Sequence, residues 1–242
     1  ILASLGYSYI EETVGGFLAP DKEESFFRRN LALAAEAPIP PKVCYSFLPG
    51  DLKSVGPQAV HRRIMEFAHI AFHRAQRAGI EMIAFGSGDS RNIPENFSLE
   101  EATKQFVSLL SQMTSIAGEY KVTIVLEPLY SGETNFINTI DEGAKIVQKV
   151  NHPNFRLLAD VYHMLMENEG PESIIENGDL IDHVHIAEKK GRSIPGTQGE
   201  DLTPYFTALK QINYRGRISI DGHWEDMEAQ APVAIKTLRK QI

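Results

Sequence analysis

Short apolar segments alternate with longer amphipathic segments along the whole chain, and this alternation most restricts the folds that the chain can adopt. The apolar segments have the length and β-branched content of buried strands: Tyr7–Glu12, Pro41–Phe47, Ile80–Gly86, Lys121–Glu127, Asn154–Asp160, Asp182–Glu188 and Gly216–Asp221. The amphipathic segments include Glu24–Glu36, Pro57–Ala78 and a closing helix that ends at Ile242. Strands that alternate with helices form βαβ units around a parallel sheet.

The number of strands favours a closed barrel over an open sheet. Seven strands are recognisable, and none is followed by a Gly-rich phosphate turn of the G-x-G-x-x-G kind. We therefore expect an α/β fold of the (β/α)₈ TIM-barrel type rather than a doubly wound sheet. The opening residues, Ile1–Glu12, are then the end of a first helix and the second strand, and the first strand is expected upstream of Ile1. No composition shift or linker divides the sequence, so we predict one domain over residues 1–242.

Composition and net charge limit which kinds of binding partner the protein is expected to have. The 43% hydrophobic content is ample for a core, and the net charge of −8 argues against nucleic acid or an anionic membrane as the main partner. No apolar run approaches the length of a membrane helix, and no signal peptide is recognisable. Cys44 is the only cysteine and cannot form an internal disulfide, which is typical of a reducing compartment. We therefore predict a cytoplasmic protein.

Four successive predicted strands end in potential metal ligands, namely Glu127, Asp160, His185 and Asp221. In a barrel, the carboxyl ends of the strands converge on one mouth, so these residues become neighbours. Glu127 ends a run of buried strand residues, where an unpaired carboxylate would cost several kcal/mol. Three carboxylates and one imidazole suit Mn²⁺, Mg²⁺ or Co²⁺ better than a structural zinc. The sequence therefore predicts one divalent metal ion at this mouth.

Each of these residues also has a simpler interpretation. A single acid at a strand end often caps the next helix, which applies to Asp160 and Asp221, and Glu127 could be a solvated rim residue. His185 could be a histidine satisfied within the core, and His183 is open to the same interpretation. The recurrence of potential ligands at four successive strand ends is what favours the metal site.

Several motifs resemble those of a known family. The segments "VLEPLYSGETNF", "LLADVYHM", "HVHIAEKKGRSIPGT" and "YRGRISID" resemble the sugar isomerase/epimerase superfamily, which has a xylose-isomerase-like barrel. The resemblance is greatest to ketose 3-epimerases of the D-tagatose/D-psicose type. It implies that the four strand-end residues bind one divalent ion, usually Mn²⁺ or Co²⁺. It also implies that Glu133, His163 and Arg192 contact the sugar, and that the protein forms a homodimer or homotetramer.

The three implied sugar contacts also suit a ketose by their own chemistry. Arg192 donates hydrogen bonds in a fixed fork, His163 can donate to an oxygen that becomes an oxyanion, and Glu133 can accept from a terminal hydroxyl. Arg192 could equally be an exposed loop cation, and Glu133 could lie in solvent.

This chain departs from the family pattern at two points. Asp221 stands where the family usually has glutamate, and it is shorter by one methylene. The interval from His185 to Arg192 is one residue longer than the family pattern. Glu225 is the alternative ligand if Asp221 does not reach the metal.

A metal flanked by two carboxylates indicates proton chemistry beside a carbonyl. By resemblance, the chain is an isomerase of carbohydrate metabolism that inverts C3 of a ketose through an enediolate, with Glu127 and Asp221 as the acid/base pair. A single base that moves a proton between C1 and C2 would instead give an aldose–ketose or hydroxypyruvate-type isomerase. A sugar-binding barrel without catalysis is a third possibility.

Overall fold

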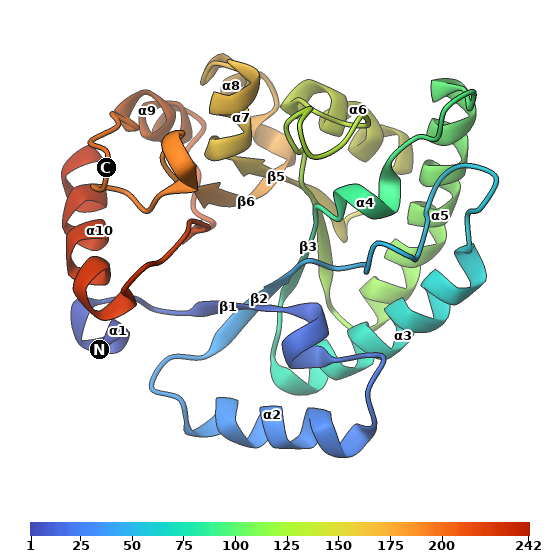
Figure 1. The fold of residues 1–242 in the computed structure, drawn as a ribbon, viewed down its shortest axis with the longest axis horizontal. Helices are drawn as coiled ribbons and strands as arrows, with labels where there is room; N and C mark the ends of the chain where they lie inside the picture. The colour runs from blue at the N-terminus through green and yellow to red at the C-terminus, as the bar shows by residue number, and fades with distance from the viewer.

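Seven parallel strands form one sheet that curls into a nearly closed barrel, with the helices outside it (Figure 1). The computed structural model describes residues 1–242. The strands pair in chain order, each with the next. They are β1 (Ile10–Thr13), β2 (Pro41–Tyr45), β3 (Met82–Phe85), β4 (Thr123–Leu126), β5 (Phe155–Asp160), β6 (Ile181–Ile186) and β7 (Arg217–Ile220). The barrel prediction is confirmed.

The helices follow the predicted order closely. They are α1 (Leu2–Leu5), α2 (Glu24–Glu36), α3 (His61–Ala78), α4 (Gly88–Arg91), α5 (Leu99–Glu119), α6 (Ile140–Val150), α7 (Val161–Glu167), α8 (Glu172–Glu176), α9 (Thr203–Gln211) and α10 (Met227–Gln241). Short helical turns lie at Val14–Leu18, Gly178–Leu180 and Lys190–Arg192. The long helix α3 begins at His61 rather than at Pro57. No helix is both long enough and apolar enough to cross a membrane.

Two helices, α5 and α6, begin at residues whose side chains cap them. The side chain of Ser98 accepts a hydrogen bond from the backbone N–H of Glu101 at 3.1 Å, and Thr139 accepts one from Glu142 at 3.2 Å. Each bond satisfies one of the unpaired N–H groups in the first helical turn. These caps define the start of α5 at Leu99 and of α6 at Ile140.

The alternation of side chains along the strands separates the apolar core from the site. The largest core cluster contains 47 buried residues, and it includes Ile124, Leu126, Leu157 and Ala159 from β4 and β5. Their neighbours Val125 and Leu158 belong to a separate small cluster with Ala84. Successive side chains of a strand point to opposite faces. Glu127 and Asp160 therefore share a face with Val125 and Leu158, inside the barrel.

Side chains rather than backbone hydrogen bonds join the two ends of the sheet. The strand order places β1 and β7 at its edges, and the Tyr9 hydroxyl lies 2.5 Å from the Ser219 hydroxyl across this seam. Beside the seam, Trp224 lines a mostly apolar groove together with residues of α1 and α10. Trp224 therefore does not line the polar cavity at the mouth of the barrel.

Candidate metal centre and substrate cavity

The four strand-end residues predicted as metal ligands lie together at the mouth of the barrel. One potential ligand atom from each of Glu127, Asp160, His185 and Asp221 can be chosen so that all lie within 4.8 Å of one another. Asp160 and His185 are each 1% exposed and Glu127 is 6% exposed. The side chain of Asp221 keeps 30% of its surface exposed. Three of the four residues are therefore buried, and only Asp221 is partly exposed to solvent.

Asp160 serves two purposes with its two oxygens. Its Oδ1 accepts a hydrogen bond from the backbone N–H of Tyr162 at 2.8 Å, so it caps helix α7. Its Oδ2 faces the site, 2.9 Å from Nη2 of Arg192. The simpler interpretation as a helix cap and the interpretation as a ligand are thus compatible. Burial raises the pKa of Asp160 to about 7.

Glu127 projects from the end of β4 over a glycine. A Cβ at position 86 would lie 2.4 Å from Oε2 of Glu127, so a larger residue than Gly86 would displace this carboxylate from its present position. The Oε1 atom lies 3.2 Å from Nδ1 of His185. Burial alone would raise the pKa of Glu127, but the hydrogen bond and positive charge of His185 hold it below its ordinary value.

His185 lies between the carboxylates. Its Nδ1 is 3.2 Å from Glu127 Oε1, 3.5 Å from Asp221 Oδ2 and 4.0 Å from Asp160 Oδ2. The shortened side chain of Asp221 thus reaches the site, whereas Glu225 is exposed and does not line the cavity. Although burial opposes a charge on this ring, the surrounding carboxylates raise the pKa of His185 well above its ordinary value.

Arg192 reaches the same carboxylates from the loop after β6. Its Nη2 lies 2.5 Å from Asp221 Oδ2, its Nε donates to the backbone oxygen of Asp221 at 3.0 Å, and its guanidinium lies over the ring of Tyr162 at 4.7 Å. Gly191 and Arg192 both have positive φ angles, 71° and 49°. This left-handed turn aims the arginine inward despite the longer interval from His185.

A buried carboxylate shapes the loop that carries Arg192. Glu188 is fully buried, and its oxygens accept hydrogen bonds from the Ser193 hydroxyl and from four backbone N–H groups, those of Gly196, Gln198, Gly199 and Glu200. Such a ring of donors stabilises a carboxylate without a cation. Glu188 therefore holds the loop closed around Arg192.

His163 lies on α7, and one of its two ring nitrogens takes part in a hydrogen bond within the protein. Its Nδ1 accepts a hydrogen bond from the backbone N–H of Tyr130 at 3.2 Å. Its Nε2 makes no hydrogen bond within the protein and lies 3.5 Å from Oδ2 of Asp160. Burial lowers the pKa of His163 to about 4. The neutral ring with an acceptor at Nδ1 carries its proton on Nε2. His163 is thus built to donate from Nε2.

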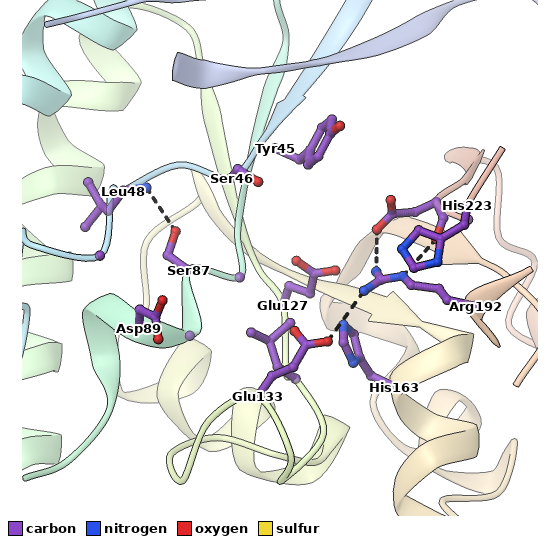
Figure 2. A pocket seen from close by; sticks show the side chains of 16 residues that line it. Tyr45, Ser46, Leu48, Ser87, Asp89, Glu127, Glu133, His163, Arg192 and His223 are labelled. Carbon is purple, nitrogen blue, oxygen red and sulfur yellow. Dashed lines mark hydrogen bonds and ion pairs between the residues drawn. The ribbon is translucent and has the colours of Figure 1, made fainter. Parts of the chain in front are cut away.

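The cavity in front of these groups has a volume of about 460 Å³ and a largely polar wall (Figure 2). Glu133 lines it and lies 3.7 Å from Nη1 of Arg192. Ser46, Ser87 and Asp89 form the wall from the β2 and β3 loops. All three side chains predicted to contact the sugar therefore face this cavity, as Figure 2 shows.

The donor set fits a divalent cation. Three carboxylates and one imidazole nitrogen converge, and the opposing cation Arg192 already pairs with two of the carboxylates. Hard oxygen donors with one imidazole suit Mn²⁺, Mg²⁺ or Co²⁺. That the four residues bind a metal stays a prediction.

Comparison with known proteins places this chain in a family. The family model described as a xylose isomerase-like TIM barrel matches residues 1–241. The chain belongs to the xylose isomerase-like TIM barrel family.

Within this family, the relatives include sugar epimerases. The L-ribulose 3-epimerase of Methylomonas sp. (strain DH-1) is 38% identical over 116 residues, which are 48% of this chain and 40% of that protein. A provisionally named hydroxypyruvate isomerase of Xenopus laevis is 31% identical over 134 residues, which are 53% of this chain and 49% of that protein. The matched regions thus span less than half the length of these relatives.

A solved structure extends the similarity over the full chain. The D-allulose 3-epimerase of Methylomonas sp., in complex with D-allulose, has a TM-score of 0.78 and 26% identity to this chain. The match covers 100% of this chain and 88% of that one.

Sequence reasoning missed four residues that shape the site. Arg91 is fully buried and donates to backbone oxygens beside Glu127, and Glu188 holds the Arg192 loop. Tyr162 supports the arginine, and Glu11 contacts His185 from β1. Glu11 lies within β1, and Glu188 lies just after β6, two residues beyond its last residue, Ile186. Arg91 carried no sequence signal beyond its charge.

Proposed function

We propose that this protein is an isomerase that inverts C3 of a ketose with the help of one divalent metal ion. The observation that carries the proposal is the position of two carboxylates around His185. Glu127 comes from the end of β4 and Asp221 from the end of β7, and they lie 3.2 and 3.5 Å from the same Nδ1 atom. Inversion requires proton transfer on both faces of a planar intermediate, and two carboxylates from separated strands suit that requirement.

The roles of the residues follow from this placement. Glu127, Asp160, His185 and Asp221 would hold the ion, which would act as a Lewis acid toward the sugar oxygens. A carboxylate oxygen of Glu127 or Asp221 takes the C3 proton, and the other carboxyl group returns one on the opposite face. His163 donates from Nε2 to a sugar oxygen as negative charge develops on it. Arg192 and Glu133 orient the remaining hydroxyls.

Similarity to the Methylomonas L-ribulose and D-allulose 3-epimerases supports the epimerase assignment. The Xenopus laevis relative supports a one-base isomerase as the second candidate. In the isomerase, a single carboxylate would move a proton between C1 and C2, and the other would serve only as a ligand.

One experiment separates these candidates. The protein is incubated with Mn²⁺ in D₂O and a panel of free ketoses, ketose phosphates and hydroxypyruvate, and the products are separated by chromatography. A 3-epimerase yields a second ketose with deuterium at C3, whereas an isomerase yields an aldose or an aldehyde. A protein that binds a ketose but converts none of them would be a sugar-binding barrel, and the proposal would be wrong.

A further inference from the structure

Glu11 is a buried carboxylate on β1 that contacts two histidines of β6. Its Oε1 lies 2.5 Å from Nε2 of His183, and its Oε2 lies 3.1 Å from Nε2 of His185. The side chain keeps only 10% of its surface exposed. Ser219 donates to the same carboxylate and in turn contacts Tyr9 at 2.5 Å. Glu11 is therefore fixed from three directions, across the seam between the two edges of the sheet.

The contact from Glu11 decides which nitrogen of His185 faces the site. Since Nε2 is directed at Glu11, Nδ1 is the nitrogen that faces Glu127, Asp160 and Asp221. A carboxylate accepts hydrogen bonds and cannot donate them, so it requires a proton on Nε2. The neutral ring then has its lone pair on Nδ1, where a metal ligand needs it.

We propose that Glu11 is a positioning residue of the metal site, which holds the ring of His185 in the orientation and tautomer that present Nδ1 to the ion. This inference rests on the proposed metal-dependent function. Carboxylates that orient a ligating histidine in this way raise metal affinity by about 10- to 100-fold. Glu11 never touches the substrate cavity and is absent from its lining.

The bond between Glu11 and both histidines explains why a carboxylate is needed here. Two oxygens accept from two N–H groups at once, as Glu11 does from His183 and His185. A glutamine has one oxygen and one NH₂ group, and the NH₂ group can only face a ring nitrogen that has a lone pair. Glu11→Gln therefore forces one histidine into the other tautomer or breaks one of the bonds.

A purely structural role is the competing explanation, in which Glu11 only ties β1 to β6 inside the barrel. That role predicts a loss of stability in Glu11→Gln with no change in metal affinity. The positioning role predicts weaker metal binding in the folded variant. The two explanations differ in metal affinity and not in stability.

The test compares Glu11→Gln with Glu12→Gln, which removes the next carboxylate of β1. Alternation along the strand places Glu12 on the other face of the sheet, where it lines a separate groove. The apoproteins are titrated with Co²⁺, which is followed by calorimetry and by the visible absorption of the bound ion. We expect Glu11→Gln to bind Co²⁺ about 10- to 100-fold more weakly with an altered spectrum. Glu12→Gln should match the wild type.

The positioning role would be overturned if folded Glu11→Gln bound Co²⁺ with an affinity within about twofold of the wild type and with an unchanged spectrum. The proposed function would remain intact. A wild type that binds no Co²⁺ would overturn both.

A second measurement needs no variant. In ¹⁵N-labelled wild type loaded with Zn²⁺, long-range ¹H–¹⁵N correlations should place the His185 proton on Nε2. A proton on Nδ1 would equally overturn the proposal, even if Glu11→Gln does not fold.

Discussion

Nη2 of Arg192 lies 2.9 Å from Oδ2 of Asp160, so the guanidinium neutralises part of the carboxylate cluster that we propose to bind a metal ion. The same nitrogen also contacts Asp221 at 2.5 Å. A cation at the centre of the cluster and the guanidinium at its edge would share these oxygens and repel each other. Burial opposes the charge of Arg192, yet the four nearby carboxylates raise its pKa above the ordinary value.

Replacing Arg192 should therefore separate metal binding from sugar binding. Two unit charges about 4 Å apart repel by roughly 1–4 kcal/mol at effective dielectric constants between 80 and 20. We expect Arg192→Gln to bind Mn²⁺ about tenfold more tightly and to lose most of its ketose affinity. Calorimetric titration with Mn²⁺, and then with ketose, measures both. Weaker Mn²⁺ binding would mean that Arg192 organises the carboxylates rather than competing with the ion.

His163→Ala should impair the reaction while leaving the metal site in place. The variant removes the Nε2 donor that no other protein group uses, and loss of one donor to a developing oxyanion costs about 100- to 1,000-fold in turnover. His73→Ala is the matched control, because His73 is exposed on α3. Steady-state rates with the best ketose, at saturating Mn²⁺, make the comparison. Unchanged turnover and ketose affinity in His163→Ala would remove this residue from the proposed site.

Arg91 is expected to stabilise the barrel from beneath the site. It donates to the backbone oxygens of five residues in the β3 and β4 ends and the following loop, namely Phe85, Gly86, Glu127, Phe136 and Ile137. Arg91→Met leaves these buried oxygens without their donor.

A buried acceptor left without its donor costs about 1–3 kcal/mol, so the denaturation midpoint of Arg91→Met should fall clearly. Arg62→Met removes an arginine whose side chain is 89% exposed and should change stability by less than about 0.5 kcal/mol. Urea unfolding of the two variants and the wild type provides the measurement. Equal midpoints for the two variants would contradict the assigned role of Arg91.

The strands and the acids at their ends were predictable because both depend on local pattern. β4 ends in the apolar run Ile124–Leu126, and Glu127 breaks this run at the position where the strand ends. The convergence of the four strand-end residues then followed from the barrel topology alone.

Residues that act from the middle of an element were not predictable. Glu11 lies at the second position of β1, and its partner His185 is 174 residues away. No local spacing links these two residues. The loop of Arg192 likewise depends on Glu188, which accepts hydrogen bonds from backbone N–H groups. Almost every residue type has a backbone N–H group, so the sequence does not indicate these bonds. Predicting the Glu11 contact requires knowledge of how β1 and β6 pack across the barrel, and predicting the Glu188 contacts requires the conformation of the loop after β6.

Glu81 should make stability depend on pH at the other end of the barrel. It pairs with Lys42 at 2.9 Å and with Arg217 at 2.8 Å. Burial alone would raise the pKa of Glu81, but these two partners hold it below its ordinary value of 4.5. A carboxylate whose pKa is lowered in the folded state stabilises the protein above its unfolded pKa. That contribution is lost as the pH falls through the folded pKa.

Glu81→Gln should therefore be less stable than the wild type at pH 7, and the difference should shrink below about pH 4.5. The side chain is 45% exposed, so the difference at pH 7 should be at most about 1 kcal/mol. Glu36→Gln is the control, since Glu36 is exposed at the end of α2. Urea midpoints between pH 3.5 and 7 give the comparison. A difference that grows toward acid pH would show that the pairs do not stabilise the fold.

The shorter acid at position 221 gives the sharpest test of the proposed mechanism. If Glu127 and Asp221 transfer protons on opposite faces, Glu127→Gln and Asp221→Asn should each abolish epimerisation, because one face loses its acid or base. The amide oxygen remains a weak ligand, so Mn²⁺ affinity should fall without vanishing. Full epimerase activity in Asp221→Asn would show that Asp221 is not the acid/base group.

The variant Asp221→Glu tests whether the backbone at position 221 is placed to suit aspartate rather than the longer glutamate. Asp221 Oδ2 already lies 3.5 Å from His185 Nδ1 and 2.5 Å from Arg192 Nη2. An added methylene would push the carboxylate into this contact, and a misplacement of about 1 Å can cost 100-fold in rate. We therefore expect Asp221→Glu to slow turnover while it retains Mn²⁺ binding. A faster variant would mean that the cavity has room for a glutamate at position 221, and that Asp221 limits the rate.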